Sequence, residues 1–333
     1  MILHPAIVAL LLSSYLVAFM VIYAAFFGLR IIRGWDIASG SEKQLALERS
    51  TYLISTFLAS AFIFQIASFF LFIYAADDLH SRFVGAMCAA GSLNVNPFGY
   101  PTFIIKIFSC ILAGLWLILN HADSKAHDYP LIRKKFVFLL IMVPFIVGEA
   151  VLQTTYFLKL TPDVITSCCG SLFSSGQDSI SGELASLPPG LMMVIFYMIL
   201  ILIIITGIRY CIWGRGARIF SLFSVIAFPV FSFSLISFIS LYCYELPTHH
   251  CPFCILQREY GNIGYLFYAT LMCGMICGAG VGMLDSFKNT GSLRNIIPAM
   301  NRKLAIFSTS GYFIFSVISI WKILAANLVL EFI

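Results

Sequence analysis

Charged residues are scarce in this 333-residue chain: Asp, Glu, Lys and Arg together make up 11% of it, whereas 60% of the residues are hydrophobic. A soluble globular domain is about a quarter charged and nearer half apolar. A chain of this composition cannot bury its apolar surface in a water-soluble core, so lipid must be the solvent for much of it. The formal net charge of +5 is small, and we expect no nucleic-acid partner.

Several motifs of well-known enzyme classes are also missing. The sequence contains no P-loop, no dinucleotide-binding glycine fingerprint and no zinc-protease motif. It contains no Cys-x-x-Cys-His, so covalent c-type haem is not expected on this chain. A cleaved signal peptide is not expected either, because the first apolar run is too long and no basic segment precedes it.

Long apolar runs are what the sequence does contain. About 20 mostly apolar residues cross the hydrocarbon core as a helix, in which the backbone groups pair internally. Eight runs qualify, at residues 5–29, 51–76, 101–120, 136–160, 190–213, 219–244, 262–284 and 304–330. We therefore predict an all-α fold, a polytopic integral membrane helix bundle with about eight transmembrane helices, forming a single transmembrane domain over residues 1–333.

The distribution of Lys and Arg predicts how the bundle is oriented. The first, third, fifth and seventh loops carry clusters of these residues, whereas the second and sixth have one Arg each and the fourth has neither. Loops rich in Lys and Arg stay in the cytoplasm. We expect both termini and the loops 77–100, 161–189 and 245–261 on the non-cytoplasmic side of a bacterial-type inner membrane, with the chain embedded as a multi-pass protein in the lipid bilayer.

Six of the ten cysteines fall on that predicted outer side. They are Cys88 in the second loop, Cys168 and Cys169 in the fourth, Cys251 and Cys254 in the sixth, and Cys243 in the last turn of the helix before the sixth. The outer side of a bacterial inner membrane is oxidising, so clustered thiols there are usually disulfides, redox centres or metal ligands.

The densest polar chemistry lies at residues 248–260, where His249 and His250 precede Cys251 and Cys254. A Cys-x-x-Cys pair at the start of a helix can close a small disulfide, and the helix dipole would favour a thiolate there. Arg258 would add positive charge on the same helix face, and the histidines could pass protons. This pattern predicts thiol–disulfide exchange, with Cys251 as the exposed attacking thiol and Cys254 as its partner, or the reverse.

The stretch Cys251-Pro252-Phe253-Cys254-Ile255-Leu256-Gln257-Arg258 resembles the Cys-x-x-Cys-x-x-Gln/Glu-Arg signature of the disulfide bond formation protein B family. The resemblance covers these eight residues. It implies a membrane oxidoreductase that passes electrons from a periplasmic thiol protein to quinone, with Cys251 and Cys254 as the redox pair and Arg258 facing the quinone. In that family the second cysteine pair follows the motif, whereas Cys88, Cys168 and Cys169 precede it here, where we expect them to relay electrons or to lock the loops.

Two other functions fit the same residues. His249, His250, Cys251 and Cys254 offer imidazole and thiolate ligands suited to Cu(I) or Zn(II), which predicts a metal-binding or metal-transporting membrane protein. Alternatively, the six outer cysteines could form three structural disulfides in a non-catalytic membrane subunit of a larger complex, whose partner would be another subunit.

Glu149 is the other candidate, because it lies near the middle of the fourth apolar run. An ionised side chain at that depth costs at least ~2.5 kcal/mol, so such residues usually line a cavity or a proton path. Glu149 could carry protons for quinone chemistry or transport. It could instead be protonated and hydrogen-bonded to a neighbouring helix, for example to Gln65. Lys106 is expected to extend toward the outer surface.

Overall fold

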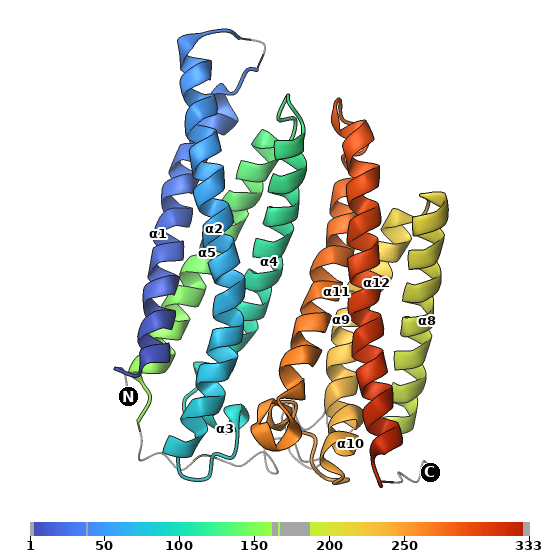
Figure 1. The fold of residues 1–333 in the computed structure, drawn as a ribbon. Coiled ribbons are helices and arrows are strands. Elements are labelled where there is room, and N and C mark those ends of the chain that lie inside the picture. The colour runs from blue at the N-terminus through green and yellow to red at the C-terminus, as the bar shows by residue number, and fades with distance from the viewer. Residues whose placement is uncertain (1–2, 38, 162–165, 167–186, 329–333) are drawn as a thin grey trace. The chain divides into compact units, whose positions relative to one another are not determined.

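The computed structural model describes residues 3–37, 39–161, 166 and 187–328, and within those residues it contains helices and no strand. Eight helices are long and apolar enough to cross a membrane, which confirms the all-α polytopic fold (Figure 1). They are α1 (Pro5–Gly34), α2 (Glu42–Asp78), α4 (Gly99–Lys125), α5 (Ile132–Leu158), α8 (Pro189–Trp213), α9 (Ala217–Ser234) with its continuation to Tyr244, α11 (Ile263–Asp285) and α12 (Leu293–Ala325).

Several helices are longer than the apolar runs that predicted them. Helix α2 begins at Glu42 rather than at residue 51, and α12 begins at Leu293 rather than at residue 304. Hydropathy marks only the part of a helix that lipid can surround, whereas the backbone hydrogen bonds continue into the polar flanks. The side of the membrane that the termini face stays a prediction.

Packing groups the chain into two compact units. The first comprises Met1–Ile73, Asn96–Leu160 and Ser286–Met300, and the second comprises Tyr74–Val95, Thr161–Asp285 and Asn301–Ile333. Helices α2 and α12 each contribute residues to both units. The single transmembrane domain predicted from the sequence stays a prediction.

In the first unit, α5 packs against α1 and α4. Gly28 of α1 lies so close to Phe136 of α5 that a β-carbon at Gly28 would come within 2.8 Å of the phenyl ring. Phe62 of α2 meets the indole of Trp116 of α4 edge-on, with ring centroids 5.0 Å apart. Since lipid is as apolar as these side chains, close van der Waals packing of this kind is what favours helix association in a membrane.

In the second unit, α9 packs against α8 and α11. A β-carbon at Gly278 of α11 would lie 2.3 Å from the β-carbon of Ser224 of α9, so only glycine fits at this crossing. The hydroxyl of Tyr312 of α12 donates to the Ser224 carbonyl at 2.6 Å, and Ser308 donates to the Gly274 carbonyl at 2.8 Å. These hydrogen bonds tie three helices together with their polar groups paired.

Two connections of the second unit place the candidate site. Helix α9 continues through a π-helical stretch, Leu235–Ile239, into α10 (Ser240–Tyr244), which ends where Glu245 takes a left-handed conformation with φ of 54°. The chain then returns to α11 through residues 246–262. After α2, a 3₁₀ turn (Leu79–Arg82) leads to the short helix α3 (Ala89–Leu93). Helices α3 and α10 are labelled in Figure 1.

Candidate functional site

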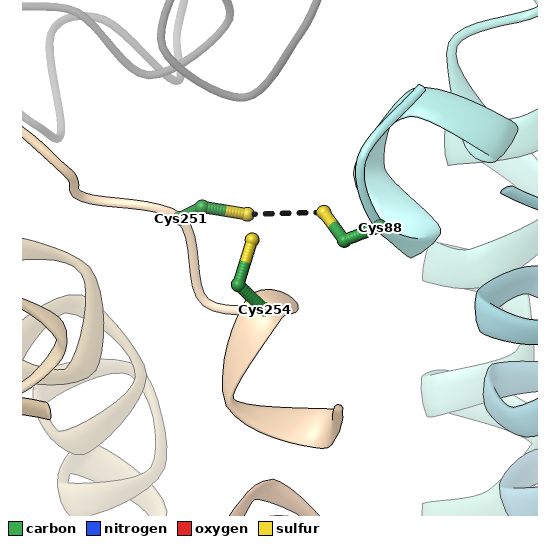
Figure 2. A group of neighbouring side chains, drawn as sticks. All are labelled: Cys88, Cys251 and Cys254. Atoms are coloured by element: carbon green, nitrogen blue, oxygen red, sulfur yellow. Dashed lines mark hydrogen bonds between the residues drawn. The ribbon is translucent and has the colours of Figure 1, made fainter. Parts of the chain in front are cut away.

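Three cysteine sulfurs converge in the second unit (Figure 2). The Sγ atoms of Cys88, Cys251 and Cys254 all lie within 4.8 Å of one another, and those of Cys88 and Cys251 are 3.6 Å apart. A disulfide bond is about 2.05 Å long, so the Cys88 and Cys251 sulfurs are in contact without being bonded to each other. The structure therefore joins the predicted Cys-x-x-Cys pair to one of the predicted loop cysteines, 163 residues away.

The three thiols differ in exposure. Cys88 and Cys251 are fully buried, whereas 5% of Cys254 is exposed. The expectation that Cys251 is an exposed thiol is wrong, and Cys254 is buried as well, although less completely. Which of the two attacks stays a prediction.

The local structure of the Cys-x-x-Cys pair also differs from the prediction of a helix start. Cys254 begins a single 3₁₀ turn that ends at Leu256, and α11 begins only at Ile263. Gln257 is extended, with φ of −71° and ψ of 157°, and it separates Cys254 from the next turn, Arg258–Tyr260. Arg258 is therefore not on a common helix face with Cys254, and neither cysteine lies in the first turn of α11.

Tertiary contacts explain why this segment is not helical. The side chain of Gln257 donates to the carbonyl of Met87, next to Cys88. The hydroxyl of Tyr244 donates to the Cys251 carbonyl at 2.6 Å, and that of Tyr268 donates to the Pro252 carbonyl at 2.7 Å. Sequence reasoning missed both tyrosines. Their positions at the end of α10 and in the second turn of α11 were the only available signal.

Cys88 lies on the other connection, the one that follows α2, and contacts within that connection position it. It is the residue before α3, in an extended conformation, and the first backbone N–H of that helix, at Ala89, donates to the Asp77 carboxylate at 3.3 Å. A carboxylate at a helix N-terminus satisfies an N–H that has no partner within the helix. Asp77 therefore orients the turn that carries the Cys88 sulfur.

The two histidines have separate roles. The Nε2 atom of His249 lies 3.3 Å from the Cys254 sulfur, and the ring of Tyr244 meets the His249 ring edge-on at 4.6 Å. Burial lowers the pKa of His249 below its ordinary value, which favours the neutral imidazole. His250 instead directs Nδ1 to the carbonyl of Ile236, in the π-helical stretch, at 3.1 Å. Only His249 faces the sulfurs.

Arg258 lies beside the sulfur group rather than in it. Its side chain is exposed and lines a pocket of about 690 Å³, which Asp77, His80, Glu259 and Tyr265 also line. Gln257 links the pocket to the sulfur group. It lines the pocket and also donates a hydrogen bond to the carbonyl of Met87, the residue before Cys88.

Among the described residues, the group contains no further outer cysteine. Cys168 and Cys169 lie outside the described residues, and their predicted role stays a prediction. Thr166, which precedes them, donates its backbone N–H to the Val84 carbonyl at 3.0 Å, four residues before Cys88. Cys243 is buried on α10.

Glu149 belongs to the first unit, where it forms a buried ion pair. Its Oε1 atom lies 2.7 Å from the ammonium of Lys106, and both residues are 1% exposed. Gln65 of α2 donates to the other carboxylate oxygen, and Lys106 also donates to Ser68 at 3.4 Å. The contact with Gln65 agrees with one of the two alternatives for Glu149, whereas the protonation that this alternative included stays a prediction. The expectation that Lys106 extends to the surface is wrong, because the carboxylate of Glu149 offers it a partner within the helix bundle. A role of Glu149 in proton transfer or quinone binding stays a prediction.

Comparisons with protein-family models, with curated proteins and with solved structures return no match for this chain, so the residues of the site are the basis for its function.

Proposed function

We propose that this protein is a membrane thiol–disulfide oxidoreductase that oxidises the thiols of a partner protein at the group formed by Cys88, Cys251 and Cys254. The observation that supports this function most directly is the convergence of three sulfurs from two distant segments, within 4.8 Å of one another. Thiol–disulfide exchange requires one sulfur to attack another in a disulfide. Three neighbouring sulfurs allow the disulfide to change partners inside the protein.

The exchange begins with a disulfide between Cys251 and Cys254. A thiolate of the partner protein attacks the more exposed sulfur, that of Cys254, so that a mixed disulfide forms and the electron pair leaves on Cys251. The second thiol of the partner then attacks the partner's first sulfur, which is bonded to Cys254. A disulfide forms within the partner, and Cys254 leaves as a thiolate. The partner has lost two electrons and two protons, and Cys251 and Cys254 are both reduced.

His249 has the geometry to handle the proton of Cys254. Its Nε2 atom is 3.3 Å from that sulfur, and the neutral imidazole favoured by burial can accept a proton from the thiol. The thiolate rather than the thiol is the nucleophile in exchange, so this transfer would prepare Cys254 for the step in which its disulfide with Cys251 forms again.

Cys88 provides the second sulfur that Cys251 can reach, at 3.6 Å. When Cys88 is bonded to another outer cysteine, the Cys251 thiolate can attack the Cys88 sulfur, form a bond between residues 88 and 251, and release that other cysteine as a thiolate. Cys168 and Cys169 are the candidates for the released thiol. This step moves a disulfide between the two connections without changing the number of electrons in the protein.

A quinone would take up the two electrons and two protons when the disulfide is restored. The pocket beside the sulfurs has residues that fit such a group: the guanidinium of Arg258 and the hydroxyl of Tyr265 are donors for the quinone oxygens, and Leu256 adds an apolar wall. Arg258 would bind and orient the ring in this role. The net reaction converts a protein dithiol and a quinone into a protein disulfide and a quinol.

The location follows from the same proposal. The site would face the periplasm of a bacterial-type inner membrane, where the partner would be a periplasmic thiol protein. The scarcity of Lys and Arg in the loops that carry the outer cysteines supports this orientation.

A metal centre is the second candidate, because one observation favours it. Two sulfurs bound to one tetrahedral zinc ion at about 2.3 Å each lie about 3.8 Å apart. The Cys88 and Cys251 sulfurs are 3.6 Å apart, and His249 Nε2 is 3.3 Å from the Cys254 sulfur. Cys88, Cys251 and Cys254 would then hold Zn(II) or Cu(I), with His249 beside Cys254. Cys88 joins the ligand set predicted from the sequence, and His250 leaves it because it faces Ile236.

One experiment separates these functions. The purified protein is equilibrated in glutathione buffers of increasing oxidising power, its thiols are trapped with a maleimide, and its metal content is measured on the same sample. The proposal expects a disulfide that includes Cys251 and titrates reversibly, with no stoichiometric metal. One copper or zinc ion per chain, lost in a Cys88→Ser variant, would favour the metal centre. Disulfides that do not respond to the buffer, without metal, would indicate a structural subunit.

A further inference from the structure

A second cavity lies in the first unit, and its wall carries several polar groups. Its volume is about 360 Å³, and it is lined by Glu48, Thr51 and Ser55 of α2, Lys135 of α5, and the rings of Trp35 and Tyr129. None of these residues belongs to the sulfur site. Residue 51 is also where the apolar part of α2 begins, so the cavity lies at the level where the helix leaves the hydrocarbon.

Two buried hydroxyls in the cavity wall have no hydrogen-bond partner among the residues that the structure describes. They belong to Thr51 and Ser55, which are 4% and 8% exposed and lie one turn apart on α2. Hydroxyls on membrane helices usually donate to the carbonyl four residues earlier, as Thr56 does to Tyr52 at 2.9 Å. Leaving a buried hydroxyl unpaired costs about 1–3 kcal/mol. The pair therefore indicates a ligand that brings acceptor oxygens.

Lys135 adds a third donor to the same cavity. Its ammonium donates to Asn120 Oδ1 at 3.0 Å and lies 3.0 Å from Asp123 Oδ2. An ammonium has three N–H groups, so one remains for a ligand. Three donors, one of them charged, fit the oxygens of a phosphate group.

Glu48 adds a carboxylate to the cavity wall. Its Oε1 accepts a hydrogen bond from Gln44 at 3.0 Å, and Gln44 in turn accepts one from the backbone N–H of Asp36 at 3.1 Å. Because Lys135 is neutralised by Asp123, this carboxylate is the uncompensated charge of the lining. It would repel a purely anionic ligand and attract a cation.

Two aromatic rings line the cavity as well. Trp35 and Tyr129 meet edge-on, with centroids 6.4 Å apart and planes at 86°. Tyr129 has φ of 44°, a conformation that residues other than glycine rarely adopt, so the surrounding structure must stabilise it. Aromatic faces together with a carboxylate form a favourable environment for an organic ammonium group.

We propose that this cavity binds a zwitterionic group in which an ammonium is linked to a phosphate, as in ethanolamine phosphate. The phosphate would accept from Thr51, Ser55 and Lys135, and the ammonium would lie against Glu48 and the aromatic rings. The group could come from the head of phosphatidylethanolamine, which lies at this level of a bilayer, or from free phosphoethanolamine. This binding site is independent of the proposed thiol chemistry.

The test measures binding to the purified full-length protein in detergent, by native mass spectrometry and by the fluorescence of tryptophan. The probes are dihexanoyl-phosphatidylethanolamine, dihexanoyl-phosphatidylglycerol, which has the phosphate but no amine, and free phosphoethanolamine. We expect the ethanolamine lipid to bind about tenfold or more tightly than the glycerol lipid. If free phosphoethanolamine binds as tightly as the lipid, the site takes a soluble ligand. If only the lipid binds, acyl chains contribute.

Variants locate the binding in this cavity. Glu48→Gln should remove the preference for ethanolamine, and Thr51→Val with Ser55→Ala should weaken binding about tenfold or more. Thr56→Val is the matched control, because Thr56 also lines the cavity but its hydroxyl is already bonded to Tyr52. Equal binding of both lipids to the unchanged protein would overturn the proposal. So would full binding by Glu48→Gln, which keeps the side-chain shape and remains informative if the double variant does not fold.

Discussion

The sulfur group of the second unit and the Lys106–Glu149 pair of the first are both buried, yet they differ in what can change. A thiol is nearly apolar and tolerates burial without a full set of hydrogen bonds. An ammonium and a carboxylate tolerate burial only as a pair, because removing one leaves a charge in a low-dielectric environment. The sulfurs therefore suit chemistry in which bonds change partners, whereas the ion pair stays unchanged unless a proton moves.

The backbone segments that carry the two groups also differ. The ion pair lies on the long helices α4 and α5, and Gln65 of a third helix completes it. Cys251 and Cys254 lie on an irregular segment that Tyr244 and Tyr268 hold by its carbonyls. Irregular segments have smaller opening free energies than packed helices, so the sulfur segment can move to admit a partner.

The largest expected effect is on thiol exchange. Cys251→Ser should abolish the reversible disulfide, because Cys251 is the sulfur in contact with Cys88 and the neighbour of Cys254. The measurement is the rate at which a reduced model protein is oxidised by the purified protein with a soluble quinone. Cys273→Ser is the control, since Cys273 is exposed on α11 outside the group, and it should retain the full rate. Equal rates for the two variants would contradict the proposed function.

The second effect is on stability. Lys106→Met should destabilise the protein by about 3–5 kcal/mol, because it leaves the Glu149 carboxylate buried without its cation. The double variant Lys106→Met with Glu149→Leu should recover most of that loss, since an apolar pair needs no compensation. Unfolding in increasing concentrations of a denaturing detergent measures both. A single variant as stable as the unchanged protein would show that Glu149 is protonated or solvated, and the contrast with the sulfur group would fail.

A smaller effect is expected at His249. Replacing it with Gln should slow alkylation of Cys254 by about tenfold or more at neutral pH, because the proton acceptor 3.3 Å from the sulfur is lost. The control is His250→Gln, since His250 faces the Ile236 carbonyl and glutamine can still donate there. Mass spectrometry of the labelled peptides gives the rates. Equal slowing by both substitutions would indicate a general change in the segment rather than proton transfer.

The smallest effect is expected at Tyr244. Tyr244→Phe removes the hydrogen bond to the Cys251 carbonyl and should cost about 0.5–1.5 kcal/mol. Hydrogen exchange of the backbone N–H groups at residues 246–262 should increase, because the carbonyl of Cys251 is released. Tyr15→Phe, at an exposed tyrosine of α1 that contacts Thr154, should leave this segment unchanged. Faster exchange in both variants, or in neither, would remove Tyr244 as a support of the site.

The sequence predicted the parts of the molecule that depend on local composition. The eight apolar runs predicted the eight long helices that the described residues contain, whereas the role of the Cys-x-x-Cys motif stays a prediction. The same motif suggested a helix start at Cys251, and that was wrong because Gln257 bonds to Met87, far away in the chain. Local propensity is overridden where a distant backbone group offers a better partner.

Partners that are distant in the chain could not be predicted from one sequence. Cys88 is 163 residues from Cys251, and Lys106 is 43 residues from Glu149. A buried Glu predicts that some compensating group exists. Lys106 lies within another apolar run, yet nothing in the spacing of the sequence predicts that Lys106 and Glu149 form a pair. Only packing decides which helix faces meet.

Disulfide mapping tests whether Cys88 converges with Cys251 and Cys254. Two variants retain Cys88 with either Cys251 or Cys254 and have serine at every other cysteine, so that no disulfide between residues 251 and 254 can compete. Each is reduced, oxidised mildly in the membrane, blocked with a maleimide and digested for mass spectrometry. We expect the peptide containing Cys88 to be joined by a disulfide to the peptide containing the second cysteine, because the three sulfurs lie within 4.8 Å of one another. If Cys88 is recovered only with the maleimide attached in both variants, the three sulfurs do not form one site.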